Sequence, residues 1–277
     1  MYGLWWLAPV GLVVGAFGTL IGAGGGFLLV PLLLLIYPHD PPELIASISL
    51  AVVFFNAASG SIAYARMRRI DYRTALILAA ATAPGAALGA FGTSALSRRA
   101  FDAVLGGVML LLAWHLLRKP RSAAPAAVAI PDEDLLPALA TPPHIAFPAR
   151  RRFRFGMLLS MVAGYLSSLL GIGGGIVHVP LLVRVMRFPV HVATATSQLI
   201  LAVMALAGTV VHLAVGNYSR GYGRTLALAV GVVVGAQFGA ALSTRLRGAW
   251  ILQSLALAIG FVGIRLLYTA WSFEAAR

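Results

Sequence analysis

Charged residues occur along this chain only in short clusters, and long stretches without charge lie between them. The uncharged stretches cover residues 4–38, 44–65, 74–97, 103–117, 155–183, 188–219, 225–244 and 248–264. A membrane-spanning helix needs about 20 mostly apolar residues to cross roughly 30 Å of hydrocarbon. Nearly all of the stretches reach that length, and the shortest reaches it when Asp102 and Arg118 lie at the interfaces. The pattern predicts a protein that crosses a membrane several times.

The same stretches favour helices over a transmembrane barrel. They lack the alternation of apolar and polar residues that outer-membrane strands show, and helices satisfy their backbone groups within one segment. Composition agrees, because 60% of the residues are hydrophobic and only 10% are charged. So little polar surface cannot coat a water-soluble globule of 277 residues. We therefore expect an all-α integral membrane protein with 8–10 membrane helices.

Two stretches are too long for one simple crossing. Residues 4–36 would form a straight helix of about 50 Å, and residues 155–183 one of over roughly 40 Å. Each contains a glycine run, Gly22-Ala-Gly-Gly-Gly26 in the first and Gly171-Ile-Gly-Gly-Gly175 in the second. Consecutive glycines disfavour continuous helix. Each long stretch is therefore predicted to break at its glycines.

The two runs belong to an internal repeat. Residues 22–31 (GAGGGFLLVP) and 171–180 (GIGGGIVHVP) share the pattern GxGGGxxxVP at an offset of 149. Further matches follow at offsets of 148 to 150 and pair these residues: Ser49 with Ser197, Gly60 with Gly208, Gly85 with Gly235, and Gly89 with Gly239. The chain is predicted to consist of two homologous membrane repeats, 1–118 and 153–277. These four pairs include six glycines, which we interpret as helix-packing positions.

Residues 119–152 lie between the repeats and differ from them in composition. They are rich in Pro and Ala, with acidic residues at 132–134 and arginines at 150–152. We interpret them as a cytoplasmic linker. Eleven of the 21 basic residues lie in the loop at 66–73 and at the two ends of this linker. Because cytoplasmic loops are enriched in Lys and Arg, both regions should face the cytoplasm of a bacterial inner membrane.

The relative orientation of the repeats depends on how each glycine break is counted. One crossing per long stretch gives four spans in each half and parallel repeats, whereas a hairpin at the glycines gives five and inverted repeats. The number of basic residues inside and outside barely separates the two models. One contrast favours inversion: the loop after the first run is acidic, with Asp40 and Glu43, and its counterpart is basic, with Arg184 and Arg187.

The doubled glycine blocks are each followed by a segment that carries Ser or Thr, 46–50 (ASISL) and 193–198 (ATATSQ). In this the chain resembles the TauE/SafE sulfite exporter family, also called the TSUP (4-toluene sulfonate uptake permease) family. The resemblance covers both membrane halves but not the linker. It implies a secondary carrier for sulfite, a sulfonate or a related organic anion, without ATP hydrolysis. Ile48 departs from the pattern, since a Thr is usual there, so the second half resembles the fuller site.

The glycine runs also predict a chemistry that does not depend on the resemblance. A glycine loop at membrane depth exposes backbone N–H groups, and a helix that starts there adds a partial positive charge. Together they form an anion receptor without a buried arginine. Tight helix packing is the alternative explanation for these glycines. The residues predicted to bind substrate are Gly22, Gly24, Gly25, Gly26, Ser49, Asn56, Gly171, Gly173, Gly174, Gly175, His178, Thr196, Ser197 and Gln198.

Several of these polar residues have a second interpretation. The hydroxyl groups of Ser49 and Thr196 could instead bond to carbonyls of their own helix. His178, where the first half has Leu29, could contact substrate, carry a proton, or be a buried neutral histidine bonded to a carbonyl. His212, Asn56 and Gln237 are further polar residues within apolar stretches.

What the sequence lacks narrows the function. Every Asp and Glu lies in a loop, the linker, a tail or a span end, so no carboxylate is expected at the bilayer centre to bind sodium or relay protons. The chain has no Cys, no His/carboxylate cluster with metal-ligand spacing and no Walker-type motif. We expect no cofactor, no metal, no nucleic-acid partner and no enzymatic activity.

The expected partners are a small anionic substrate and the lipid bilayer, and the sequence is compatible with a homo-oligomer. An anion channel and a non-transporting membrane scaffold are the alternative functions. A scaffold would not require two matched glycine breaks. The identity of the anion, the direction of transport and the coupling ion are left open by the sequence.

Overall fold

The computed structural model describes residues 4–117, 150–216 and 221–243, together with 256–257, 260–268 and 271. All regular structure in these residues is helical, which confirms the all-α prediction. The helices are α1 (Leu7–Ile21), α2 (Gly26–Ile36), α3 (Pro42–Arg66), α4 (Tyr72–Thr93), α5 (Arg98–Leu117), α7 (Arg150–Leu170), α8 (Gly175–Pro180), the π-helix η3 (Leu181–Val185), α9 (Val190–Ala214) and α10 (Tyr222–Leu242). Most of the predicted linker lies outside the described residues, and its last three residues begin α7.

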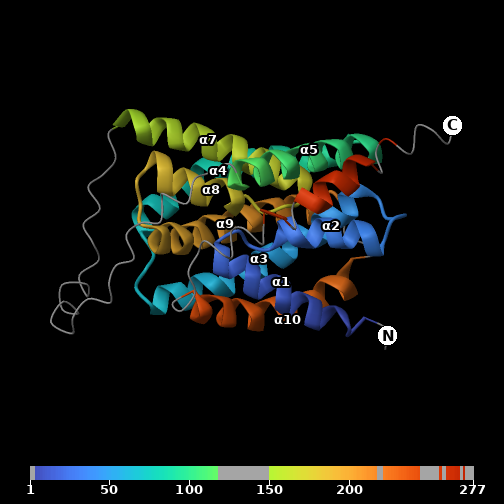
Figure 1. Cartoon of the computed structure of the whole chain (residues 1–277), viewed down its shortest axis with the longest axis horizontal. Helices are drawn as coiled ribbons and strands as arrows, with labels where there is room; N and C mark the ends of the chain where they lie inside the picture. The colour runs from blue at the N-terminus through green and yellow to red at the C-terminus, as the bar shows by residue number, and fades with distance from the viewer. Residues whose placement is uncertain are drawn as a thin grey trace.

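Five helices in the described part of the chain are long and apolar enough to cross a membrane. They are α3, α4, α9, α10 and residues Phe153–Leu170 of α7. Three shorter apolar helices, Leu7–Ile21, Gly26–Ile36 and Gly175–Val185, accompany them. The helices lie side by side along the long axis of the molecule (Figure 1). This arrangement is that of a multi-pass membrane protein.

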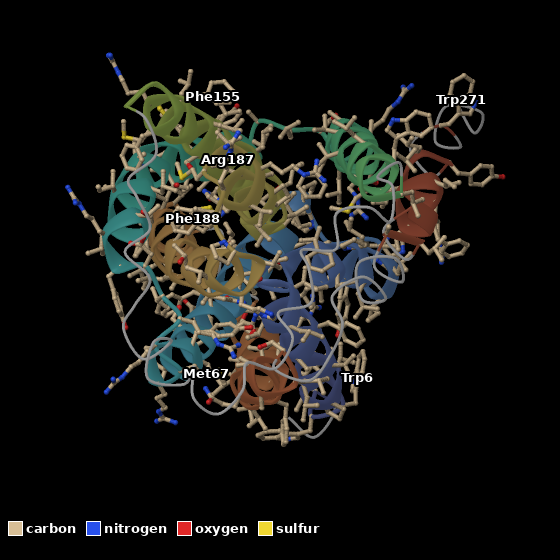
Figure 2. The ribbon with its side chains drawn as sticks, turned by 60° about the vertical axis from the view of Figure 1, so that its left-hand side comes forward. Trp6, Met67, Phe155, Arg187, Phe188 and Trp271 are labelled. Carbon is tan, nitrogen blue, oxygen red and sulfur yellow. The ribbon has the colours of Figure 1, made fainter. Side chains whose placement is uncertain are left out.

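The outside of the bundle is apolar, and polar side chains are buried within its mostly apolar interior. Leu111 is 68% exposed, Leu226 64% and Phe238 61%. Figure 2 shows Trp6, Phe155 and Trp271 at the rim of the same bundle. Buried polar side chains lie inside it, among them Ser47, Ser49, Asn56, Thr196, Ser197 and Gln198, none of them exposed. An apolar exterior of this extent suits lipid as the surrounding solvent.

Glycines let four of the helices approach closely. Gly85 and Gly89 of α4 lie against the carbonyl oxygens of Met161 and Tyr165 of α7. The later residue of α4 thus meets the later residue of α7, so the two helices run parallel. Without a Cβ, backbones approach to a distance that larger residues would prevent.

The same contact recurs between α10 and α1. Gly235 and Gly239 lie against the carbonyl oxygens of Leu12 and Ala16, so α1 and α10 are parallel too. The interpretation of these four glycines as packing positions is confirmed.

The pair α3 and α9 is antiparallel. Gly60 of α3 lies beside the Gln198 side chain, and Gly208 of α9 lies beside Leu50. The later residue of one helix thus meets the earlier residue of the other. Of the two, α3 is the more enclosed, because 72% of its most apolar segment is buried against 44% for that of α9.

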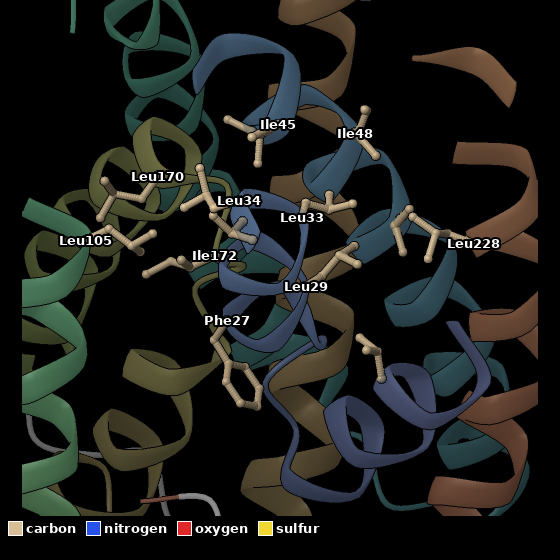
Figure 3. Close-up of a cluster of buried hydrophobic side chains, with 14 of the residues drawn as sticks. Phe27, Leu29, Leu33, Leu34, Ile45, Ile48, Leu105, Leu170, Ile172 and Leu228 are labelled. Atoms are coloured by element: carbon tan, nitrogen blue, oxygen red, sulfur yellow. The ribbon is translucent and has the colours of Figure 1, made fainter. Parts of the chain in front are cut away.

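The short helix α2 lies in the largest apolar core. Figure 3 shows its residues Phe27, Leu29 and Leu33 among apolar side chains from α3, α5, α7 and α10. Each of the three is 1% exposed. An 11-residue helix is marginal by itself, so α2 is stabilised by these neighbours.

One ion pair and one hydrogen bond hold the loop between α2 and α3 to two other helices. Arg224 of α10 pairs with the Asp40 carboxylate and lies over the Tyr37 ring, 3.6 Å from its centroid. Arg98 of α5 donates to the Asp40 carbonyl oxygen at 2.7 Å and pairs with Asp102 at 3.1 Å. Arg98 and Arg224 at this end of the bundle are therefore both matched to acceptors.

Candidate functional site

The first glycine run lies between α1 and α2. Helix α1 ends at Ile21, α2 begins at Gly26, and φ is +79° at Gly22, +75° at Gly24 and +80° at Gly25. Side chains other than glycine rarely adopt this left-handed region. The three glycines turn the chain sharply between the two helices.

The second run lies between α7 and α8. Helix α7 ends at Leu170, α8 begins at Gly175, and φ is +70° at both Gly171 and Gly173. Gly174 differs from its counterpart Gly25, because its φ is −65°. The two turns are therefore similar but not identical in backbone conformation.

The two turns pack directly against each other. A methyl group built on Gly26 would lie 2.7 Å from the carbonyl carbon and oxygen of Ile172. One built on Gly175 would lie 2.5 Å from the Cα atom of Ala23. The starts of α2 and α8 thus lie side by side in the bundle interior, although 149 residues separate them in sequence.

The first N–H groups of α2 and α8 lack backbone acceptors. The Gly25 carbonyl accepts from the N–H groups of Leu28 and Leu29, and the Gly174 carbonyl accepts from those of Val177 and His178, all at 3.0 Å. Among the described residues, the N–H groups at positions 26, 27, 175 and 176 make no hydrogen bond to a backbone carbonyl. Unpaired N–H groups at a helix start are donors for an anion.

Each glycine turn is tied by one serine to a helix of the other half of the chain. The Ser49 hydroxyl of α3 donates to the Gly171 carbonyl at 2.6 Å, and the Ser197 hydroxyl of α9 donates to the Gly22 carbonyl at 2.9 Å. All four groups are buried. These hydroxyl hydrogens are used to hold the turns in place, and in this structure they do not point to an open position.

Asn56 and Gln198 lie in a buried polar cluster beside the first turn. The Thr19 hydroxyl donates to Asn56 Oδ1 at 3.1 Å, Tyr64 donates to the Thr19 carbonyl at 3.0 Å, and Gln198 Nε2 donates to the Gly18 carbonyl at 3.3 Å. Asn56 Nδ2 and Gln198 Oε1 have no hydrogen-bond partner in the described part of the chain. One buried donor and one buried acceptor are thus free for a ligand or water.

His178 lies on the inner side of the second turn. Its Nδ1 is 2.8 Å from the Gly174 carbonyl oxygen, and its Nε2 is 3.5 Å from Thr82 Oγ1 of α4. The Thr82 hydroxyl donates to the Leu78 carbonyl at 2.6 Å. Since a carbonyl can only accept, Nδ1 carries a hydrogen. Its hydrogen bond to the Gly174 carbonyl holds the ring against the turn.

Thr196 lies away from the other predicted site residues. Its Oγ1 accepts from the Asp71 N–H at 3.1 Å, which links α9 to the loop before α4. The structure therefore brings together the two turns with Ser49, Asn56, His178, Ser197 and Gln198, and places Thr196 toward the loop between α3 and α4.

Thr19, Tyr64 and Thr82 are site neighbours that the sequence reasoning did not select. Each is a polar residue in an apolar stretch, and Thr19 lies only three positions before the first glycine run. That combination of polarity and nearness to the run is the signal that could have identified Thr19. Nothing comparable in the sequence distinguishes Tyr64 or Thr82.

Negative charge is scarce around the turns. Within the described part of the chain, no group of three or more His, Asp or Glu side chains could hold a metal ion. Asp102, which is 2% exposed, pairs with Arg98 at the start of α5. A buried anion at the turns would thus meet helix starts and neutral polar groups.

Comparison with known proteins places the chain in a family. The family model described as Sulfite exporter TauE/SafE matches residues 7–266, so the chain belongs to that family. A "Probable membrane transporter protein YunE" of Bacillus subtilis is 28% identical over 95% of this chain and 96% of its own length. A "Probable membrane transporter protein" of Xylella fastidiosa is 30% identical over 95% and 94%, and one of Methanocaldococcus jannaschii is 24% identical over 94% of each chain. No solved structure matches the chain.

These comparisons confirm the resemblance read from the glycine blocks. The family and the relatives are membrane transporters and not enzymes, which agrees with the prediction of a non-enzymatic protein. The chain is accordingly a membrane transporter of the TauE/SafE family.

Proposed function

We propose that this transporter is a secondary carrier of a small anion, such as sulfite, a sulfonate or a related organic anion. The observation that carries the proposal is the contact between the starts of α2 and α8, where N–H groups from two helices find no backbone acceptor among the described residues. The family description supports the substrate class, since it names a sulfite exporter.

The physical basis is the partial positive charge of a helix N-terminus. Each start contributes roughly half an elementary charge, and two adjacent starts reinforce each other. An anion also meets little repulsion, because the carboxylates of the described residues lie toward the helix ends and loops. Glycines at the turns allow the backbone to approach the anion without a side chain between them.

The predicted residues take distinct roles in this proposal. Gly26 and Gly175 carry N–H groups that face the anion, and Gly22, Gly24, Gly25, Gly171, Gly173 and Gly174 shape the two turns. Asn56 and Gln198 offer the unpaired amide atoms. Ser49 and Ser197 hold the turns in place, and His178 supports the second one.

We further propose that residues 1–118 and 153–277 are inverted repeats joined by a cytoplasmic linker at 119–152. Support comes from matched contacts: α4 packs on α7 through Gly85 and Gly89, and α10 packs on α1 through the corresponding Gly235 and Gly239. The antiparallel course of the equivalent helices α3 and α9 favours inversion over parallel repeats. In this topology each glycine-broken segment is a hairpin that enters from one side of a bacterial inner membrane.

Transport assays on purified protein in liposomes test the proposed function. Vesicles loaded with sulfite, ethanesulfonate, acetate or chloride are tested for counterflow of the same labelled anion. Saturable counterflow of at least one oxyanion supports a carrier. Unitary currents would indicate a channel, and the absence of both binding and flux for every anion would indicate a scaffold.

A further inference from the structure

Arg69 in the loop between α3 and α4 has a charged donor that finds no acceptor among the described residues. Its side chain is partly buried, and its Nη1 atom is buried with no hydrogen-bond partner. A guanidinium group stays charged at any physiological pH and carries five N–H donors. An unmatched buried donor on a permanent cation is costly, and an anion bound here would supply the missing acceptor.

The surroundings of Arg69 are polar and come from two helices. Its backbone N–H donates to the Tyr64 carbonyl of α3 at 3.2 Å. Two residues further on, the Asp71 N–H donates to Thr196 Oγ1 of α9 at 3.1 Å. The nearby Asp71 carboxylate caps α4, because its Oδ1 accepts from the Thr74 N–H. The first turn of α9 contains no acidic residue.

A line of buried polar groups leads from Arg69 to the first glycine turn. Tyr64, next to Arg69, donates to the Thr19 carbonyl, and the Thr19 hydroxyl donates to Asn56. Gly60 lies between Thr19 and the Gln198 side chain. A Cβ built on it would be 3.1 Å from Thr19 Oγ1 and 3.4 Å from Gln198 Cδ. Arg69 therefore stands at one end of a polar path whose other end is the proposed central site.

The opposite end of the bundle is different. There Arg98 pairs with Asp102, and Arg224 pairs with Asp40. Those arginines have carboxylates within the chain, whereas the free Nη1 of Arg69 has none in contact. Among the described residues, the unpaired Nη1 of Arg69 thus contrasts with the carboxylate-paired Arg98 and Arg224 at the opposite end.

We propose that Arg69 forms a second anion site, which binds a small oxyanion at the end of α3 before it reaches the glycine turns. The inference rests on the proposed function, because it places a further step on the path of the same substrate. The planar guanidinium fork matches two oxygens of a sulfite, sulfate or sulfonate group in a bidentate contact.

The test compares Arg69 with Arg66, the exposed last residue of α3. Wild-type protein and the variants Arg69→Gln, Arg69→Lys and Arg66→Gln are purified, and monodispersity is checked by size exclusion. The concentration of sulfite that half-saturates counterflow is measured for each in liposomes. Arg69→Gln is expected to raise it about tenfold, Arg69→Lys by a smaller factor, and Arg66→Gln by less than about twofold.

The outcomes separate this inference from the proposed function. Sulfite counterflow that is equal in wild-type, Arg69→Gln and Arg66→Gln protein would refute the Arg69 site and leave the carrier intact. Equal losses in Arg69→Gln and Arg66→Gln would also refute it, because loop charge alone would then account for the effect. If wild-type protein carries none of the tested anions, the proposed function fails and the Arg69 site fails with it. Should Arg69→Gln not yield folded protein, the ratio of Arg69→Lys to wild type decides the matter, with no change counting against the site.

Discussion

At the residue scale, the glycines of the two turns are not equivalent. Gly175 has a negative φ and could adopt the backbone of alanine, yet its neighbours leave no space for a methyl group. Gly174 also has a negative φ, and its nearest neighbours are the His178 ring and the Met204 sulfur, both 3.2 Å from a built Cβ. Those two side chains can move, whereas the backbone of Ala23 beside Gly175 cannot.

This difference predicts that alanine is harmful at position 175 and tolerated at the adjacent position 174. Gly175→Ala should lower the free energy of unfolding by about 1–3 kcal/mol through overpacking and should abolish anion counterflow. Gly174→Ala should change stability by less than about 0.5 kcal/mol, as side chains shift slightly. Thermal unfolding in detergent and counterflow in liposomes measure both effects. Equal tolerance of the two variants would mean that the turns are not packed together in the membrane.

A second prediction at this scale concerns the serines that tie the turns. Ser49→Ala and Ser197→Ala should each cost about 1 kcal/mol, because a buried carbonyl loses its donor. Hydrogen exchange should become faster in residues 22–25 for Ser197→Ala and in residues 171–174 for Ser49→Ala. Ser94→Ala is the control, since that exposed hydroxyl bonds only to its own helix end. Exchange that is unaltered in both turns would show that the serines do not hold them.

At the element scale, glycine determines which helices can pair. Gly89 of α4 lies against α7, with the Leu169 nitrogen 2.9 Å and the Tyr165 carbonyl carbon 3.0 Å from a built Cβ. Gly107 of α5 has nothing within 4 Å of that position. Both glycines are helical, so a valine at either one alters intrinsic helix propensity by a similar amount. Any difference between them must come from helix packing.

We therefore expect Gly89→Val to destabilise the bundle by roughly 3 kcal/mol and Gly107→Val to leave it close to wild type. Yield of monodisperse protein and the thermal unfolding midpoint in detergent are the measurements. Gly239→Val, on the equivalent face of α10, should behave like Gly89→Val because Ala16 lies against it. Similar midpoints for all three variants would contradict parallel packing of these helix pairs.

Elements of this fold could be predicted because each rests on a local property. Stretches of uncharged residues located the helices, and the glycine runs lie at the connections from α1 to α2 and from α7 to α8. The π-helix at 181–185 was not foreseen, since no residue there distinguishes it from α-helix. The site was harder to predict: Ser49 reaches a carbonyl 122 residues away, and such a contact depends on which helices pair. Thr196 illustrates the same limit, because its sequence neighbours Ser197 and Gln198 face the turns and Thr196 does not.

At the scale of the whole molecule, the net charge of +13 does not favour one repeat orientation over the other, because basic residues occur at both ends of the bundle. Helix directions are more informative. If α3 runs toward the cytoplasm, the antiparallel α9 runs away from it, and the loops before these two helices lie on opposite faces of the membrane. The acidic loop around Asp40 and the basic loop around Arg187 would then face different compartments, as the positive-inside rule favours.

Labelling of single cysteines can decide between inverted and parallel repeats, and the absence of native Cys makes each introduced thiol unique. His39 and Ser94 are exposed in one pair of loops, and Arg68 and Arg187 are exposed in another. Inverted repeats predict that His39→Cys and Ser94→Cys react with an impermeant maleimide in intact cells, and that Arg68→Cys and Arg187→Cys react only after permeabilisation. Parallel repeats put positions 39 and 187 on the same face, because the two loops correspond at the repeat offset. Equal reactivity of those two positions in intact cells would therefore exclude the hairpin topology and, with it, two helix starts that meet from opposite sides of the membrane.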